Sequence, residues 1–166
     1  MRIALLSHAL PPENTEGIAR QRWILAGESA RLGHEVHLFA PGYRNDFRRE
    51  AEIRIHTVAV DRCPPPTPGL PAFAPLMRAS AALFAALRDV HKTDPFDVME
   101  TPLWPGLGWV AIERAPWPTV VTLQTASAQQ AAINEEAPSA AVGRFGLDCA
   151  HTLASLEAMP ATARDA

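Results

Sequence analysis

The sequence predicts an α/β domain built on a mostly parallel sheet with helices on both faces. One observation is a strand, loop, helix and strand pattern over residues 1–42, which is typical of a βαβ unit. Another is that strand-like and helix-like segments keep alternating further along the chain. With 166 residues, the chain is long enough for one domain and too short for two ordinary ones.

The βαβ unit begins with the apolar run 3–6 and ends with a second apolar run at 36–40. Between them a helical pattern opens at Gly17 and closes at Gly33, a residue type that tolerates the left-handed conformation after a helix. Arg22 interrupts this pattern. Apolar residues at helical spacing form two edges of the helix, with Ile18, Leu25 and Leu32 on one and Ala19, Trp23, Ala26 and Ala30 on the other.

The later elements follow in chain order. Residues 43–52 are polar, and we expect a loop with at most one helical turn. Residues 53–60 alternate and carry β-branched side chains, which indicates a strand. Residues 63–75 hold six prolines and can form neither a helix nor a central strand. The remaining predicted elements are a helix over 76–91, a strand over 96–101, a helix over 104–114 with Pro105 in its first turn, a strand over 119–123 and a helix over 145–159.

Composition narrows the classes of function. The net charge is −3 and lysines and arginines do not cluster, which argues against nucleic-acid binding as the main function. Cys63 and Cys149 match no metal or redox spacing, so we expect free thiols in a reducing cytoplasm and a cytoplasmic protein. The apolar run after Arg2 is too short for a signal peptide, and no stretch approaches the roughly 18 apolar residues of a membrane span. Peripheral association with a membrane stays open.

The predicted topology places a ligand site beyond the carboxyl ends of the central strands. Glu100 lies at the end of a predicted central strand, and Gln124 and Thr125 follow the end of another. A carboxylate buried at such a position needs a partner or a ligand, so we interpret these three residues as candidates for substrate binding.

Three further candidates flank the first predicted helix, where free backbone N–H groups attract anions. Gly17 has two interpretations: either it lets the backbone approach a phosphate or sugar closely, or it is simply the glycine at which the helix starts. Glu16 lies beside it, and pairing with Arg20 one turn on is the alternative to a ligand role. His8 follows the first strand and either faces the site or is a structural histidine. The other histidines, His37 and His56 among them, show no ligand spacing.

No phosphate-binding glycine motif, nucleophile elbow or metal-ligand cluster stands out in the sequence. Five segments, however, occur in the order of a known family: Pro11-Pro12, Gly17–Arg20, Leu32–Val36, Asp97–Pro102 and Thr119–Leu123. With them the whole chain resembles the N-terminal domain of the retaining glycosyltransferases of family 4, which have the GT-B fold.

This resemblance implies that residues 1–166 form a single Rossmann-like domain, the acceptor-side half of a GT-B fold, truncated before the donor-binding domain. It implies transfer of a glycosyl group from a nucleotide diphosphate sugar to an acceptor, with retention. The sugar nucleotide is then a co-substrate, and no cofactor or metal is expected. The partner would be a C-terminal donor-binding domain or a separate chain, and we expect the 166-residue chain alone to be inactive.

Two departures from the family pattern concern the site. The family usually has two adjacent glycines where this chain has Glu16-Gly17, and a carboxylate at Glu16 would repel a diphosphate. The family usually has a histidine where this chain has Gln124, which can hydrogen-bond a sugar hydroxyl but cannot relay a proton. The alternative function is therefore a non-catalytic or degenerate Rossmann-like binding module that acts through a partner.

Overall fold

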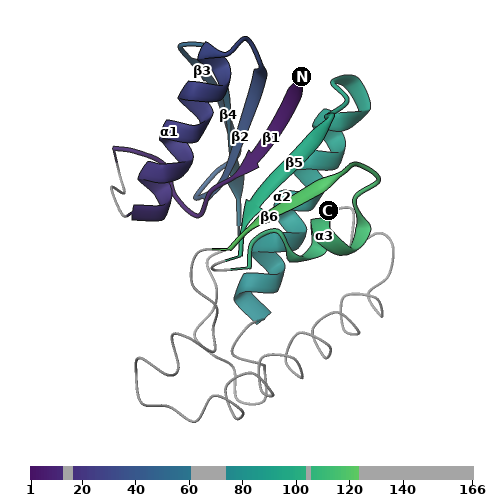
Figure 1. The fold of residues 1–166 in the computed structure, drawn as a ribbon. Coiled ribbons are helices and arrows are strands. Elements are labelled where there is room, and N and C mark those ends of the chain that lie inside the picture. The colour runs from purple at the N-terminus through teal and green to yellow at the C-terminus, as the bar shows by residue number, and fades with distance from the viewer. Residues whose placement is uncertain (13–16, 61–73, 104–105, 124–166) are drawn as a thin grey trace.

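The computed structural model describes residues 1–12, 17–60, 74–103 and 106–123 (Figure 1). Several predicted features lie outside these ranges, namely Glu16, Gln124, Thr125, the proline-rich residues 61–73 and the helix expected over 145–159. Among the described residues, no helix combines the length and apolar composition needed to cross a bilayer. The elements of the described ranges are β1 (Arg2–Leu6), α1 (Gly17–Arg31), β2 (Glu35–Gly42), β3 (Asp46–Glu50), β4 (Ile53–Ala59), α2 (Ala74–Thr93), β5 (Val98–Pro102), α3 (Trp109–Arg114) and β6 (Thr119–Thr122).

These strands form one sheet in the order β3-β4-β2-β1-β5-β6. Every neighbouring pair is parallel except β3 and β4, which pair antiparallel. Helix α1 packs on one face, and α2 and α3 cover the other (Figure 1). The predicted mostly parallel α/β fold with helices on both faces is therefore confirmed.

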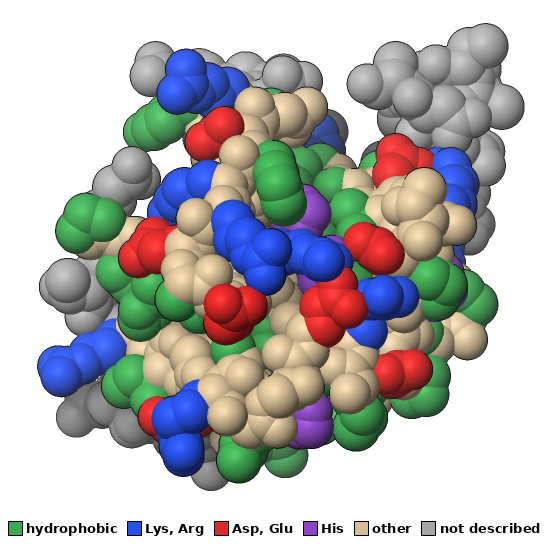
Figure 2. All heavy atoms as spheres, turned by 90° about the horizontal axis from the view of Figure 1, so that it is seen from above, with side chains coloured by type: hydrophobic (Ala, Val, Ile, Leu, Met, Phe, Trp, Pro, Cys, Tyr) green, Lys and Arg blue, Asp and Glu red, His purple; other side chains and the backbone are tan. Residues whose placement is uncertain are grey.

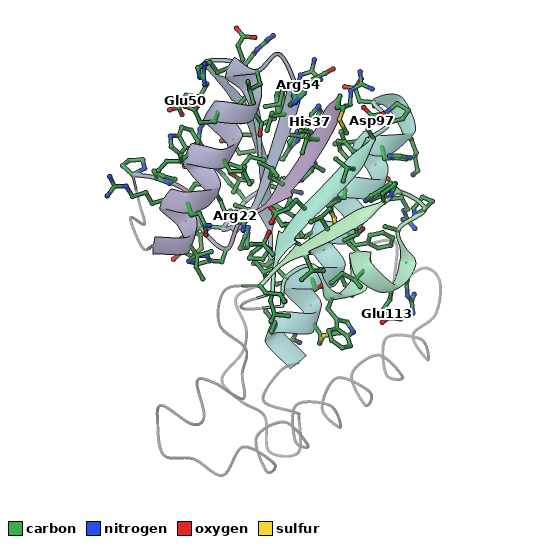
Figure 3. All side chains as sticks on the ribbon, viewed as in Figure 1. Arg22, His37, Glu50, Arg54, Asp97 and Glu113 are labelled. Carbon is green, nitrogen blue, oxygen red and sulfur yellow. The ribbon has the colours of Figure 1, made fainter. Side chains whose placement is uncertain are left out.

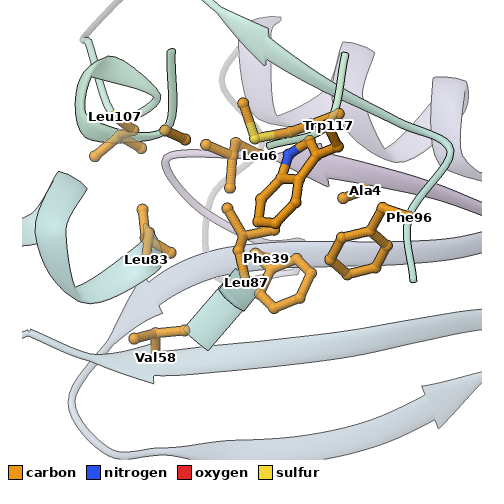
Figure 4. Packing of buried hydrophobic residues seen from close by; sticks show 11 residues of the cluster. Ala4, Leu6, Phe39, Val58, Leu83, Leu87, Phe96, Leu107 and Trp117 are labelled. Atoms are coloured by element: carbon orange, nitrogen blue, oxygen red, sulfur yellow. The ribbon is translucent and has the colours of Figure 1, made fainter. Parts of the chain in front are cut away.

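The core divides into two layers because successive strand residues point to opposite faces. In β2, Leu38 packs in the layer under α1, and Phe39 packs in the layer under α2 and α3. The second layer is the larger, and Trp117 and Phe96 meet edge to face within it, with ring centroids 5.8 Å apart (Figure 4). The central strands are covered on both faces, which explains why their sequences read as short continuous apolar runs.

Helix α1 buries one of its two predicted apolar edges. Ala19 and Ala26 are buried, and Trp23 packs against the same layer. Leu25 and Leu32, on the other edge, are 38% and 67% exposed. The small alanines bring the helix backbone close to the sheet.

The loop expected over residues 43–52 is wrong, because Asp46–Glu50 form strand β3. This strand lies at the edge of the sheet, and its residues are exposed or half-buried. Its side chains are not buried in the core, so burial imposes no alternation of apolar residues on its sequence. A two-residue turn leads from β3 into β4, and within it Ala51 has a φ of +50°, in the left-handed region.

The two helices on the second face also differ from their predicted bounds. Helix α3 begins at Trp109 rather than at residue 104, because Gly106 has a φ of +91° that no right-handed helix contains. Residues 104 and 105 lie outside the described ranges. Helix α2 begins at Ala74, two residues earlier than predicted, with Pro75 in its first turn, where a proline removes no helical hydrogen bond.

Candidate functional site at the carboxyl ends of the strands

The sheet contains a topological switch point between β1 and β5, because the chain adds strands first on one side of β1 and then on the other. From β1 the chain passes through α1 to β2 on one side, and from β4 it passes through α2 to β5 on the other side of β1. In open α/β sheets, ligands bind beside the carboxyl ends of the strands at such a switch point. The carboxyl ends of β1, β5 and β6 lie next to one another there, as the sequence predicted.

Glu100 occupies this point. It pairs in register with Leu5 of β1 and with Val120 of β6, and only 8% of its surface is exposed. One carboxylate oxygen, Oε2, accepts from Nη1 of Arg22 in α1, and the other, Oε1, accepts from the hydroxyl of Thr122 in β6. The carboxylate therefore joins helix α1 to strands β5 and β6 at the switch point of the sheet.

Arg22 is the largest fully buried side chain among the described residues, with 1% exposure. It points from α1 toward the carboxyl ends of the strands (Figure 3). Burial lowers the pKa of its guanidinium, which nevertheless stays charged at neutral pH beside the carboxylate of Glu100. Within the described part of the chain, its Nε makes no hydrogen bond. Among the described residues, the positive charge of Arg22 is balanced by the carboxylate of Glu100.

The sequence did not identify Arg22 as a site residue. It interrupts the apolar pattern of the helix, although its three-residue and four-residue separations from Ala19 and Ala26 place all three on one face. An arginine on the buried face of a helix and a glutamate at the end of a buried strand are opposite charges that both require a partner. These two features of the sequence together could have predicted that Arg22 and Glu100 pair.

The structure places two other candidates at the same edge of the sheet. His8 lies two residues beyond the end of β1 and is half-buried. Gly17 is the first residue of α1, and α1 begins at the edge where β1 ends (Figure 1). A Cβ added at Gly17 meets no described atom within 4 Å, and its φ lies outside the left-handed region. Packing and conformation within the described residues do not require glycine at this position.

A second polar cluster lies at the opposite, amino end of the sheet (Figure 2). Oxygen atoms of Glu35 and Asp94 and a ring nitrogen of His37 lie within 4.8 Å of one another, the spacing of potential metal-binding atoms. Nη1 of Arg54 already contacts all three, at 3.0 Å from His37 Nε2 and 3.2 Å from Asp94 Oδ2. Because the chain supplies its own cation here, we assign no metal to this cluster.

Comparison with known proteins gives one family match. Residues 16–159 match the family model described as a glycosyl transferase 4-like domain. No curated protein matches the chain.

Two solved structures of sucrose-phosphate synthase from Thermosynechococcus elongatus have a similar fold. The first is 18% identical with a TM-score of 0.57 and matches over 75% of this chain and 33% of its own. The second is 17% identical with a TM-score of 0.51 and matches over 75% of this chain and 64% of its own. This chain therefore spans about a third of the first structure and less than two thirds of the second.

Proposed function

Because the chain belongs to the glycosyl transferase 4-like family, we propose that it is the acceptor-side domain of a glycosyltransferase. In this proposal a glycosyl group moves from a nucleotide diphosphate sugar to an acceptor with retention of configuration. The two similar structures carry the name sucrose-phosphate synthase, which supports a sugar as one of the substrates.

The observation that carries the proposal is the carboxylate of Glu100 at the switch point of the sheet. Its two oxygens accept from Arg22 and Thr122. A carboxylate offers about four lone-pair sites, so two donors leave acceptor capacity for a ligand. Sugar hydroxyls are donors of the kind that such a site takes. The fixed ionised carboxylate would orient the hydroxyl without having to reorganise.

A second domain or a partner chain completes the proposed cleft. This chain covers only part of the structures that resemble it, which supports the proposal that it supplies one wall of a cleft at the strand ends. We propose that the opposite wall holds most of the donor. The 166-residue chain alone then binds an acceptor weakly and does not transfer sugar.

The alternative is a binding module without catalysis. Its support is that both oxygens of Glu100 already have partners within the fold, so the residue has a structural task whether or not a ligand binds. The two departures from the family pattern, at Glu16 and Gln124, also support a binding module without catalysis.

A transfer assay on the complete gene product, with a panel of nucleotide diphosphate sugars, separates the two proposals. Transfer that requires sequence beyond Ala166 supports the acceptor-side domain, and the anomeric configuration of the product tests retention. A reading frame that continues into a second α/β domain with two glutamates eight residues apart supports the enzyme. Sugar binding without transfer by the complete product supports the binding module, and transfer by the 166-residue chain contradicts the two-wall cleft.

A further inference from the structure

Two histidines, one buried and one half-buried, form a pair toward the amino end of the sheet, away from Glu100. His37 in β2 is 1% exposed, and its Nδ1 lies 3.1 Å from Nε2 of His56 in the neighbouring strand β4. The planes of the two rings are nearly parallel, at an angle of 8°, and their centroids are 5.2 Å apart, as expected for rings that meet edge to edge. His37 and Arg54 lie together in this region (Figure 3). The pair stands on the face of the sheet that α2 covers.

Arg54 sets the direction of the hydrogen bonds in this pair. Its Nη1 lies 3.0 Å from Nε2 of His37, and a guanidinium can only donate. Nε2 of His37 must therefore accept, which leaves the proton of this ring on Nδ1. That proton is donated to Nε2 of His56, so His56 carries its own proton on Nδ1. A single arrangement of tautomers satisfies the chain from Arg54 through His37 to His56.

An additional proton would disrupt this run of hydrogen bonds, although Oε1 of Glu35, 3.7 Å from Nε2 of His37, would attract it. A proton on Nε2 of His37 would face the guanidinium of Arg54, and a proton on Nε2 of His56 would face the N–H of His37. Either one removes a hydrogen bond and puts a second positive charge beside Arg54. The geometry alone thus opposes protonation of both rings.

The surroundings include groups that favour a positive charge and groups that oppose it. Glu35, at the start of β2, and Asp94, just after α2, both face Arg54 and attract positive charge. Arg2 in β1 pairs with the same two carboxylates, with nitrogen–oxygen distances of 3.1 and 3.5 Å, and partly neutralises them.

Aromatic rings enclose the rest of the histidine pair. Phe39 of β2 stacks on His56 at 4.3 Å and Phe47 of β3 meets it at 5.0 Å, while Phe96 contacts His37 edge-on at 5.2 Å. Burial is the largest cause that lowers the pKa of His37, followed by the charge of Arg54. Burial, then His37 and then Arg54 lower the pKa of His56 to about 4.

We propose that the His37–His56 pair is an acid-sensitive joint that fastens the β3–β4 hairpin and the end of α2 to the centre of the sheet. Arg54 and His56 belong to β4, His37 to β2, and Asp94 to the segment after α2, so the hydrogen-bond chain ties three parts of the fold together. Proton uptake would break this chain. A hollow of about 360 Å³ is lined in part by Glu35 and Arg54, two of the charged groups next to the pair.

The sign of the pH effect follows from the direction of the pKa changes. An unfolded histidine takes up a proton near pH 6.5, whereas folded His56 does so only near pH 4. Between these values the unfolded chain binds more protons, so stability is complete above about pH 6.5 and falls as the pH falls toward 4. Carboxylates titrate mainly below pH 5, so the interval from pH 6.5 to 5 isolates the histidines.

The first test uses nitrogen-15 NMR of the imidazoles in the unaltered full chain. At pH 6 we expect both rings of the pair to be neutral with the proton on Nδ1. A doubly protonated ring in either residue, or a proton on Nε2 of His37, would overturn the proposal. This measurement needs no substitution and does not depend on how well a variant folds.

The second test is urea unfolding of the full chain at pH 6.5 and 5.0. For His56 alone, the folding equilibrium constant should fall about fifteenfold over this interval. His56→Phe keeps a ring against Phe39 and removes the titrating group. In this variant the fall of the folding equilibrium constant between pH 6.5 and 5.0 should be about fifteenfold smaller than in the unaltered chain. His34→Gln, outside the pair, should leave the fall unchanged. An equal fall in His56→Phe and in the unaltered chain would contradict the joint.

Amide hydrogen exchange locates the effect. On going from pH 6.5 to 5.0, after correction for the intrinsic exchange rate, protection should decrease more in β4 than in β5. Equal loss of protection in the two strands would show that acid weakens the whole domain, and would overturn the assignment of a local joint.

Discussion

Glu100 and Arg22 are 78 residues apart in the chain, and their side chains form a buried ion pair at the switch point of the sheet. The pair fastens α1 to β5, and through Thr122 also to β6. The other buried residues of α1, Ala19 and Ala26, are small and apolar, so Arg22 is the charged residue on the buried face of this helix.

Glu100→Gln should lower the free energy of unfolding by about 3–5 kcal/mol, because it leaves the charge of Arg22 buried without a counter-ion. Urea unfolding measures the loss. The matched control is Glu28→Gln on the same helix, where the ion pair with Arg31 is exposed and should contribute no more than about 0.5 kcal/mol. Similar losses in the two variants would mean that Arg22 has access to water.

The double variant Arg22→Met with Glu100→Gln should recover at least half of that loss, because it removes the unpaired charge and keeps the volume of the helix side chain.

The same double variant also separates structure from function in the complete gene product. If Glu100 binds a sugar hydroxyl, the stabilised double variant should still show an acceptor KM raised several-fold. An unchanged acceptor KM would assign Glu100 to the fold alone.

Thr122→Val should cost about 1.5 kcal/mol of unfolding free energy, since the hydroxyl donates to the charged Oε1 of Glu100 and valine keeps the β-branched shape. Thr119→Val is a control within the same strand, because its hydroxyl lies 3.5 Å from its acceptor, the carbonyl oxygen of Trp117, and makes a weak bond. Chemical denaturation of both variants checks the difference. Equal costs would show that the bond to Glu100 adds nothing to stability.

Ala51→Gly should stabilise the fold by about 0.5–1 kcal/mol. The left-handed φ of +50° costs an L-residue about 1–2 kcal/mol, which exceeds the entropy cost of glycine. Ala115→Gly, at a φ of −68°, should instead lose stability. Thermal melts of the two variants should therefore shift in opposite directions, and a lower melting temperature for Ala51→Gly would contradict the turn conformation.

Two glycines near each other in the chain should respond oppositely to alanine. Gly27 lies inside α1, and a Cβ there meets no described atom within 4 Å, so Gly27→Ala should gain about 1 kcal/mol. Gly33 has a φ of +85°, so Gly33→Ala should lose about 1 kcal/mol or more. Urea midpoints that move in the same direction for both variants would contradict this account of the helix end.

The sequence predicted those elements of the fold in which buried apolar residues recur at a regular spacing. The strands around Leu5 and Leu38 and helix α1 were recognisable because each carries a periodic apolar pattern. Strand β3 was not recognisable, because none of its side chains is buried and backbone pairing with β4 places no demand on side-chain type.

The candidate site was predicted only in part, for a different reason. Glu100 could be identified because its position at the end of a buried strand is a local property. Arg22 and the His37–His56 pair depend on contacts between separate elements, which no spacing within one element reveals. Sequence reasoning found the strand ends but missed the partners that hold their side chains.

Strand β3 also determines how the sheet meets other molecules. Within the described residues it is an edge strand, and four of its five residues are charged, namely Asp46, Arg48, Arg49 and Glu50, while the fifth, Phe47, is 60% exposed. Charged edge strands resist pairing with other chains. The hairpin therefore presents an edge that is poorly suited to pairing with a strand of another copy of the protein.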